Sequence, residues 1–185
     1  MTVPQLATLL AATACFASYF WGLVRFFRQP GGQERDIRLI KAATAVAVWS
    51  HVAAIVFFYR HDAWRFAAAL ALYAAALAIY WWCIRVNRAR PLSIAFSHDR
   101  PEHVMAAGPY RAVRHPLYVS YMLCWVAGAL AAGQPLLILT VLGMGWIYHR
   151  AALAEEAKFA ASPLAGEYAG YMRRTGRYFP RMPRR

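Results

Sequence analysis

Three long stretches of the chain contain no Lys, Arg, Asp or Glu, and no other feature restricts the fold as strongly. They cover residues 3–24, 42–59 and 66–84. An α-helix rises about 1.5 Å per residue, so about 20 apolar residues cross the roughly 30 Å hydrocarbon core of a bilayer. The chain is 61% hydrophobic yet carries a formal net charge of +13, a combination unusual for a soluble domain. These stretches predict three transmembrane helices.

A fourth apolar stretch, residues 117–148, is interrupted by the sequence Gly133-Gln134-Pro135, and the basic residues indicate whether it crosses once or twice. Of the 21 Lys and Arg residues, only Arg60 and Arg65 lie between the second and third stretches, and none lies in this turn. A hairpin over residues 117–148 places all the others on one side, as the positive-inside rule favours. The sequence therefore predicts an all-α integral membrane protein with five transmembrane segments, its N-terminus outside and its C-terminus in the cytoplasm.

The chain divides into residues 1–84, which hold the three N-terminal helices, and residues 85–185, which hold a polar loop, the hairpin and a basic tail. Neither the loop nor the tail is long enough to bury a core of its own, so both are expected to pack on the cytoplasmic ends of the helices. Ser162 is a good N-cap and Pro163 suits the first helical position. The tail is therefore expected to form two short helices over residues 150–161 and 163–174.

The sequence "GPYRAVRHPLY", residues 108–118, concentrates polar and stiff residues, and we refer to it as the His-Pro segment. Gly108 can adopt a positive φ, Pro109 and Pro116 fix φ, and His115 is disfavoured in helical geometry because a proline follows it. Pro116 is expected to begin the next membrane helix, whose N-terminal N–H groups would favour an anionic ligand. An ordinary juxtamembrane turn with interfacial tyrosines and arginines accounts for the same residues, so both interpretations stay open.

Two groups of polar residues follow the hairpin. Glu155 and Glu156 are adjacent carboxylates, which can bind ribose hydroxyls or a cation, or can interact with the helix dipole. Helical spacing places four residues of "GEYAGYMRR" on one face, where they can contact a substrate or lipid headgroups. These four residues are Glu167, Tyr168, Tyr171 and Arg174.

The order of these segments, from "GPYRAVRHPLY" through a membrane hairpin to "EEAKF", "GEYAGYMRR" and "RYFP", resembles the isoprenylcysteine carboxyl methyltransferase family and its wider relatives, the membrane-embedded phospholipid methyltransferases. The resemblance covers about residues 90–180. It implies an S-adenosylmethionine-dependent methyltransferase with a non-Rossmann cofactor site, and the chain indeed has no strand–helix GxGxxG motif. A lipophilic or lipidated acceptor would enter from the bilayer. Together with the charge distribution, the resemblance predicts a bacterial inner membrane protein with a cytoplasmic active site.

The resemblance also implies roles for individual residues. The cofactor site would be lined by Tyr110, His115, Pro116, Leu117, Tyr118, Glu155 and Glu156. The acceptor would be held by Arg114, Tyr168, Tyr171 and Arg174, with Arg114, Arg174 and Glu167 as the candidate catalytic residues. Phe159 stands where a leucine is usual, and "LAGEY" replaces the more typical Phe-Gly before Glu-Tyr.

The identity of the acceptor stays open. A carboxylate, as in an isoprenylcysteine, is already a nucleophile at pH 7 and needs only an arginine to orient it. A phenol, whose ordinary pKa is about 10, would need a base, for which His115, His103 and Glu167 are available. An amine headgroup is equally compatible with the sequence.

Two other functions are compatible with this architecture. Membrane sterol reductases that use NADPH have a similar C-terminal half, but their arginine- and lysine-rich signature is not found, and Glu155 and Glu156 would repel a phosphorylated cofactor. A non-enzymatic scaffold that binds anionic lipids would need only the basic cytoplasmic face. Nucleic-acid binding is not expected, because the basic residues are dispersed over several membrane-flanking segments. The oligomeric state stays open.

No metal site or disulfide is expected. Cys15, Cys83 and Cys124 lie in apolar stretches without metal-ligand spacing, and the loop from His98 to His103 has no helical pairing of its ligand-type residues. His51 is an ionisable group inside a predicted span and hence a functional candidate. We expect a neutral histidine that forms a hydrogen bond with a neighbouring helix.

Overall fold

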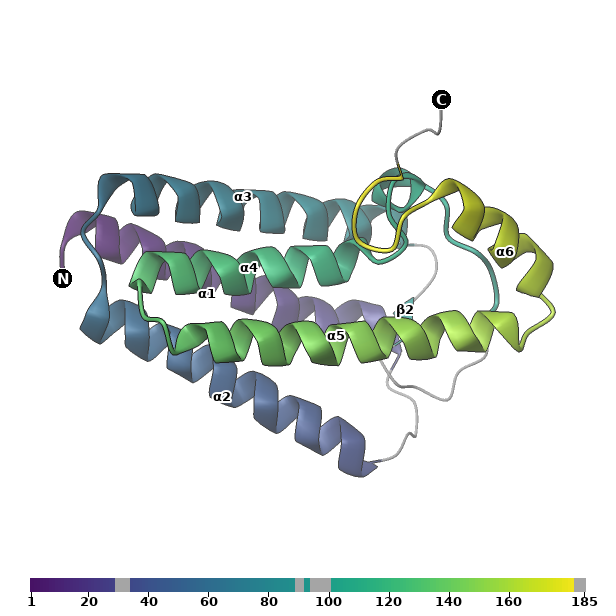
Figure 1. Ribbon diagram of the computed structural model, residues 1–185, viewed down its shortest axis with the longest axis horizontal. Helices are drawn as coiled ribbons and strands as arrows, with labels where there is room; N and C mark the ends of the chain where they lie inside the picture. The colour runs from purple at the N-terminus through teal and green to yellow at the C-terminus, as the bar shows by residue number, and fades with distance from the viewer. Residues whose placement is uncertain (29–33, 89–91, 94–100, 182–185) are drawn as a thin grey trace.

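The computed structural model describes residues 1–28, 34–88, 92–93 and 101–181. Figure 1 shows a bundle of long helices with a short helix, α6 (Ala165–Arg174), at one end. The long helices are α1 (Val3–Phe26), α2 (Glu34–Phe58), α3 (Ala63–Val86), α4 (Pro116–Ala132) and α5 (Leu137–Ala160). The other regular elements are a 3-10 turn, η1 (Gly108–Arg111), and a parallel pairing of β1 (Phe27–Arg28) with β2 (Leu92–Ser93).

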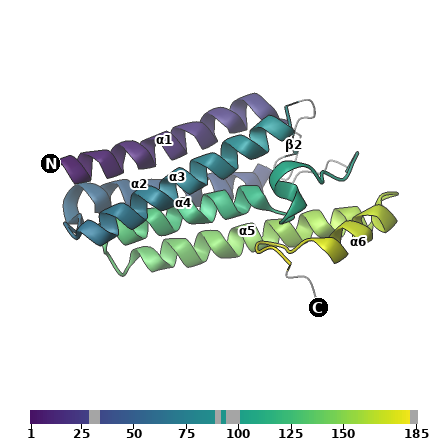
Figure 2. The same ribbon diagram turned by 90° about the horizontal axis from the view of Figure 1, so that it is seen from above.

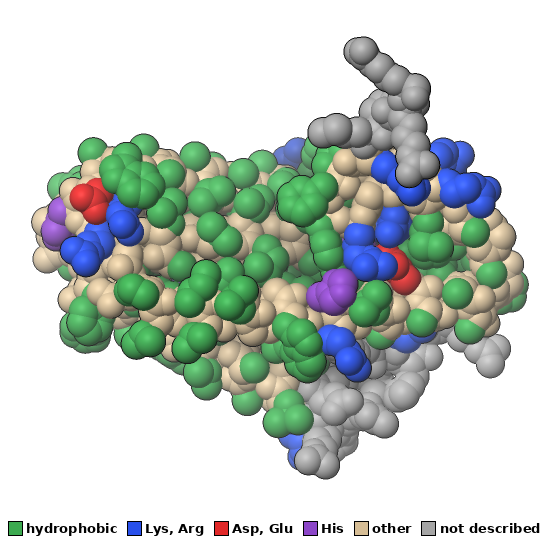
Figure 3. Space-filling model, in the orientation of Figure 1, with side chains coloured by type: hydrophobic (Ala, Val, Ile, Leu, Met, Phe, Trp, Pro, Cys, Tyr) green, Lys and Arg blue, Asp and Glu red, His purple; other side chains and the backbone are tan. Residues whose placement is uncertain are grey.

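Four described helices are long and apolar enough to cross a membrane: α1, residues 38–58 of α2, α3 and α5. Helix α4 is also apolar but has only 17 residues, which is near the lower limit for a span. Figure 3 shows apolar side chains over the middle of one face and charged side chains gathered toward its two ends. Each of the five expected segments is therefore helical, and the charge distribution fits a bilayer around the middle of the bundle.

Helix α4 lies at the centre of the bundle and contacts all four of the other long helices. Its approach to α3 is close because alanines occupy the interface, as small residues do between membrane helices. The shared core contains Ala69, Ala76, Ala127 and Ala131, each of which has no exposed surface. Some polar residues inside the bundle form hydrogen bonds between helices; for example, the Ser120 hydroxyl donates to the Ala76 carbonyl at 2.8 Å.

The connections between the helices fall at two opposite ends of the bundle. Figures 1 and 2 place the N-terminus, the α2–α3 connection and the α4–α5 turn at one end, and the His-Pro segment with α6 at the other. Helices α4 and α5 pack together as a helical hairpin. Helix α4 ends at Ala132, and the C-cap residue Gly133 has a left-handed φ of 65°. Gly108 has φ of 55°, as its place at the start of the His-Pro segment predicts.

The predicted boundaries need three corrections. Helix α2 begins at Glu34, ahead of the apolar stretch. No separate helix forms over residues 150–161, because α5 continues without a break to Ala160. Helix α6 begins at Ala165, since Ser162 and Pro163 form a turn in which the Ala165 N–H donates to the Ser162 carbonyl at 3.1 Å.

Candidate active site

The His-Pro segment is fixed by its backbone. His115 has φ of −124° and ψ of 60°, outside helical geometry as the following proline requires, and Pro116 is the first residue of α4. The segment runs alongside residues 175–181, the described chain after α6, which we call the tail from here on. There Val113 and Gly176 form a parallel bridge. The Arg114 N–H donates to the Gly176 carbonyl at 2.8 Å, and the His115 N–H donates to the Arg177 carbonyl at 3.2 Å. The tail therefore holds Arg114 and His115 over the end of α5.

Glu156, on the last turns of α5, joins three segments through its carboxylate. Arg114 Nε and Arg177 Nε donate to its Oε1 at 3.0 and 3.1 Å, and Arg177 Nη2 donates to its Oε2 at 2.7 Å. His115 Nε2 lies 3.2 Å from Oε1. The side chain is 11% exposed, so these are largely desolvated, charge-assisted contacts. Glu156 therefore ties the His-Pro segment and the tail to α5.

Glu155 approaches the His115 ring from its other nitrogen. His115 Nδ1 lies 3.5 Å from Glu155 Oε2, and the Tyr118 hydroxyl donates to Glu155 Oε1. Burial of the imidazole lowers the pKa of His115, but its hydrogen bonds to Glu155 and Glu156 and their negative charges raise it more, so that the pKa lies above its ordinary value. The surroundings thus stabilise the imidazolium relative to the neutral ring, with one carboxylate beside each nitrogen.

Aromatic rings form a wall behind this cluster. The Tyr118 ring stacks on His115 and on Tyr148, with centroid distances of 5.5 and 5.4 Å. Tyr178 of the tail lies 6.2 Å from the His115 ring, and its hydroxyl is 3.2 Å from His149 Nδ1. The cluster therefore places two carboxylates beside aromatic rings, with Arg114 and Arg177 bonded to one of the carboxylates.

Two more of the predicted residues stabilise the His-Pro segment from outside the cluster. Tyr110 is buried, and its hydroxyl accepts a hydrogen bond from Asn87 Nδ2 at 3.3 Å. The Tyr171 hydroxyl donates to the Tyr110 carbonyl at 2.7 Å, which attaches α6 to the segment. Tyr168 is buried against Phe159, and their ring centroids are 4.2 Å apart. Phe159, which stands where the resemblance implies a leucine, therefore provides the surface on which Tyr168 packs.

The structure does not bring all of the predicted residues together. Glu167 and Arg174 are exposed on α6, whereas Tyr168 and Tyr171 are buried, so these four residues do not line one common surface. Pro116 is fully buried and Leu117 is half-buried. His103 is described, but residues 94–100, and with them His98, lie outside the described residues.

Sequence reasoning missed Arg177, the bidentate partner of Glu156, and also Tyr148 and Tyr178. Arg177 is part of "RYFP", one of the segments that carry the resemblance. The C-terminal part of the chain contains many arginines, so the sequence does not indicate which of them meets Glu156. Among the described residues, no group of three or more His, Cys, Asp or Glu side chains is placed to hold a metal ion.

The fold and the site together define a helical membrane protein with a polar cluster at one end of its bundle. A family model described as phospholipid methyltransferase matches residues 64–162, from α3 to just beyond α5. The chain belongs to this family of integral membrane methyltransferases.

A curated relative is the cobalt-zinc-cadmium resistance protein CzcN of Cupriavidus metallidurans. It is 36% identical over 80 residues, which make up 43% of this chain and 36% of the relative. The match thus spans only about a third of the length of that protein. No solved structure matches the chain significantly.

Proposed function

We propose that the protein transfers a methyl group from S-adenosylmethionine to a lipophilic acceptor at the cytoplasmic face of a bacterial inner membrane. The observation that carries the proposal is the pair of adjacent carboxylates, Glu155 and Glu156, on either side of His115 at the basic end of the bundle. Family membership supports methyl transfer, and the excess of basic residues at this end supports its cytoplasmic orientation.

The two carboxylates differ in whether their oxygens can still accept hydrogen bonds from a cofactor. Both oxygens of Glu156 are already engaged by Arg114, His115 and Arg177, so its task is to position the site. Glu155 is 33% exposed, and the contact of its Oε2 with the described part of the chain is the one to His115 at 3.5 Å. Glu155 can therefore accept hydrogen bonds from an ammonium group or from ribose hydroxyls.

These residues fit S-adenosylmethionine, which is a cation with an ammonium group and ribose hydroxyls. When bound, the cofactor supplies an electrophilic methyl group on a sulfonium centre. Glu155 and Tyr118 would hold it, and the stacked rings of Tyr118 and Tyr148 exclude water from one side. The protein's contribution is alignment and desolvation, because a methyl transfer of this kind needs no covalent intermediate with the chain.

The state of His115 favours an acceptor that needs no base. Its Nε2 lies 3.2 Å from Glu156 and its Nδ1 lies 3.5 Å from Glu155, so neither ring nitrogen is open to take a proton from an acceptor. A carboxylate acceptor is already ionised, so O-methylation of a carboxylate fits better than that of a phenol. Of the two arginines expected to hold the acceptor, Arg114 is engaged by Glu156 and by the Thr175 carbonyl at 2.6 Å. Arg174 is exposed on α6, so it would have to turn toward the cluster to orient an acceptor.

Binding of S-adenosylhomocysteine to the detergent-purified chain is the first test, measured as a rise in the thermal unfolding midpoint. We expect a rise with S-adenosylhomocysteine and none with NADPH. Glu155→Gln should abolish the rise, and His115→Ala and Glu156→Ala should weaken it. Glu167→Gln, an exposed glutamate on α6, is the matched control and should keep it. Arg174→Ala should keep cofactor binding but lose turnover.

The outcomes separate the alternatives. A rise with NADPH alone would assign the protein to the reductases, and no rise with either ligand would contradict the proposal. Equal loss of binding in Glu155→Gln and Glu167→Gln would show that Glu155 has no special role in binding the cofactor.

A further inference from the structure

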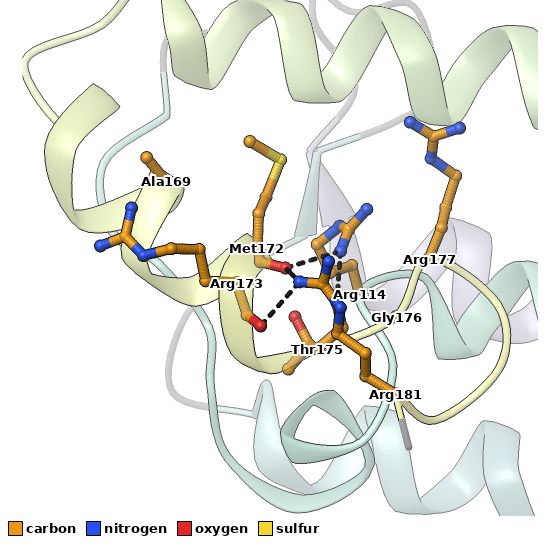
Figure 4. A pocket seen from close by; sticks show the side chains of 8 residues that line it. All are labelled: Arg114, Ala169, Met172, Arg173, Thr175, Gly176, Arg177 and Arg181. Carbon is orange, nitrogen blue, oxygen red and sulfur yellow. Dashed lines mark hydrogen bonds between the residues drawn. The ribbon is translucent and has the colours of Figure 1, made fainter. Parts of the chain in front are cut away.

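An open depression of about 600 Å³ lies between α6, the tail and the His-Pro segment. Figure 4 shows the eight residues that line it, half of which are arginines and none of which is acidic. The arginines are Arg114, Arg173, Arg177 and Arg181. Such a concentration of guanidinium groups in one concave surface needs a source of negative charge.

The protein neutralises only part of this charge. Glu156 forms ion pairs with Arg114 and Arg177 on the side that faces α5. Among the described residues, no carboxylate forms an ion pair with Arg173 or Arg181. Four guanidinium groups are thus set against one carboxylate, and the excess positive charge lies on the side of the depression away from the proposed cofactor site.

Two of the arginines are held side by side. Arg181 Nη1 donates to the Met172 carbonyl at 2.9 Å and to the Arg173 carbonyl at 2.6 Å, and Arg114 Nη1 reaches the same Met172 oxygen at 3.5 Å (Figure 4). The C-terminal end of α6 attracts cations through its dipole, which explains one arginine at this place. Two guanidinium groups at one carbonyl oxygen repel each other, and an anion that binds both would remove the repulsion.

We propose that this depression binds a phosphate group. Figure 4 shows Arg114 and Arg181 lying together, with the Arg173 and Arg177 side chains extending away from them to opposite sides. The paired guanidinium groups can bind one anion, and a phosphate monoester offers them three terminal oxygens and close to two negative charges at pH 7, against two oxygens and one charge for a carboxylate. The inference does not depend on methyl transfer. The phosphate can belong to a lipid headgroup or be free in solution.

The test is a thermal unfolding titration of the full chain in a neutral detergent at constant ionic strength. The probes are dihexanoyl phosphatidic acid, inorganic phosphate, phosphate-free dihexanoylglycerol and succinate. We expect the midpoint to rise with the phosphate compounds only. The double variant R173Q/R181Q should raise the apparent Kd at least about tenfold, as expected for losing charge-assisted hydrogen bonds.

A matched control removes the same charge from the same end of the bundle. Arg85 and Arg88 are exposed at the C-terminal end of α3, and R85Q/R88Q should bind like the wild type. Arg181 also stabilises the end of α6, so R173Q alone is the second variant. Within the described part of the chain, the Arg173 side chain forms no hydrogen bond that this substitution would remove. R181K keeps the charge but not the planar donor pair and should also weaken binding.

Each outcome supports or overturns the proposal. Tighter binding of the lipid than of inorganic phosphate assigns the phosphate to a headgroup, and equal binding assigns it to a free phosphate. Equal responses of the two double variants, or equal stabilisation by succinate, would overturn it. Loss of S-adenosylhomocysteine binding in R173Q/R181Q would do so too, because the depression would then belong to the cofactor. Failure of wild type to bind S-adenosylhomocysteine contradicts only the proposed function.

Discussion

His115 is the residue whose protonation can report on the electrostatics of the site. Its pKa is lowered by burial but raised more by Glu155 and Glu156, so the net value exceeds the ordinary one of about 6.5. Its contribution to folding is then complete below about pH 6.5 and is lost as the pH rises through the folded pKa. We expect the difference in unfolding midpoint between wild type and His115→Gln to be largest at acidic pH and to shrink at alkaline pH.

The measurement is thermal unfolding of both proteins over a pH series in one detergent. In a Glu155→Gln background one of the two carboxylates that raise the pKa is neutral, so the difference should shrink at lower pH than in the wild type. A difference that stays constant or grows with pH would show that the imidazolium form is not the stabilised one.

At the scale of single residues, the sequence predicts contacts between residues that belong to the segments on which the family resemblance rests. The resemblance placed His115, Tyr118, Glu155 and Glu156 in one site, and the structure brings these four together. It could not identify Arg177, because the choice among the tail arginines depends on the path of the tail beside the His-Pro segment.

At the scale of helices, the packing of α4 on its neighbours depends on Gly128. A Cβ at this position would lie 2.4 Å from His51 Nδ1 and 3.1 Å from the Tyr73 hydroxyl, and both of these side chains are buried. His51 Nε2 lies 2.7 Å from the Thr140 hydroxyl of α5, so the expected hydrogen bond to a neighbouring helix is confirmed. Helices α2, α3, α4 and α5 therefore meet around this glycine.

Gly128→Ala should destabilise the bundle by about 1–3 kcal/mol, the usual cost of overpacking a core. This corresponds to a decrease of roughly 2–4 °C in the unfolding midpoint per kcal/mol. Gly143→Ala is the matched control, since no heavy atom lies within 4 Å of its added Cβ, and it should leave the midpoint unchanged or raise it slightly. If both variants unfold at the same temperature, the close packing around Gly128 is not as the structure describes.

The sequence predicted the existence of the helices better than their ends. The apolar stretches marked α1, α3 and the hairpin, because a lipid-exposed segment must satisfy its backbone hydrogen bonds within a helix. Hydropathy says nothing about a helix that continues beyond the membrane, and so α5 was expected to end at Tyr148 although no proline follows before Pro163. For the same reason hydropathy did not predict that α2 begins at Glu34, because its first turns are polar.

At the scale of the whole molecule, the two ends of the bundle differ sharply in charge. Within the described ranges, Arg60 and Arg65 are the only Lys or Arg residues at the end that holds the α4–α5 turn, and Arg65 is paired there with Asp62 at 3.0 Å. If all five long helices cross the membrane, the positive-inside rule orients the basic end, with the candidate site, toward the cytoplasm. Helix α4 is the critical element, because it is the shortest of the five.

Cysteine labelling of spheroplasts tests this orientation. Arg111→Cys and Leu136→Cys flank α4, and Ala161→Cys follows α5; all three positions are exposed. The native Cys15, Cys83 and Cys124 are at most 1% exposed and should give little background. We expect a membrane-impermeant maleimide to label Leu136→Cys in intact spheroplasts, and Arg111→Cys and Ala161→Cys only after lysis. If Arg111→Cys and Leu136→Cys react from the same side, α4 does not cross the membrane. The predicted orientation, which requires all five long helices to cross, would then be wrong.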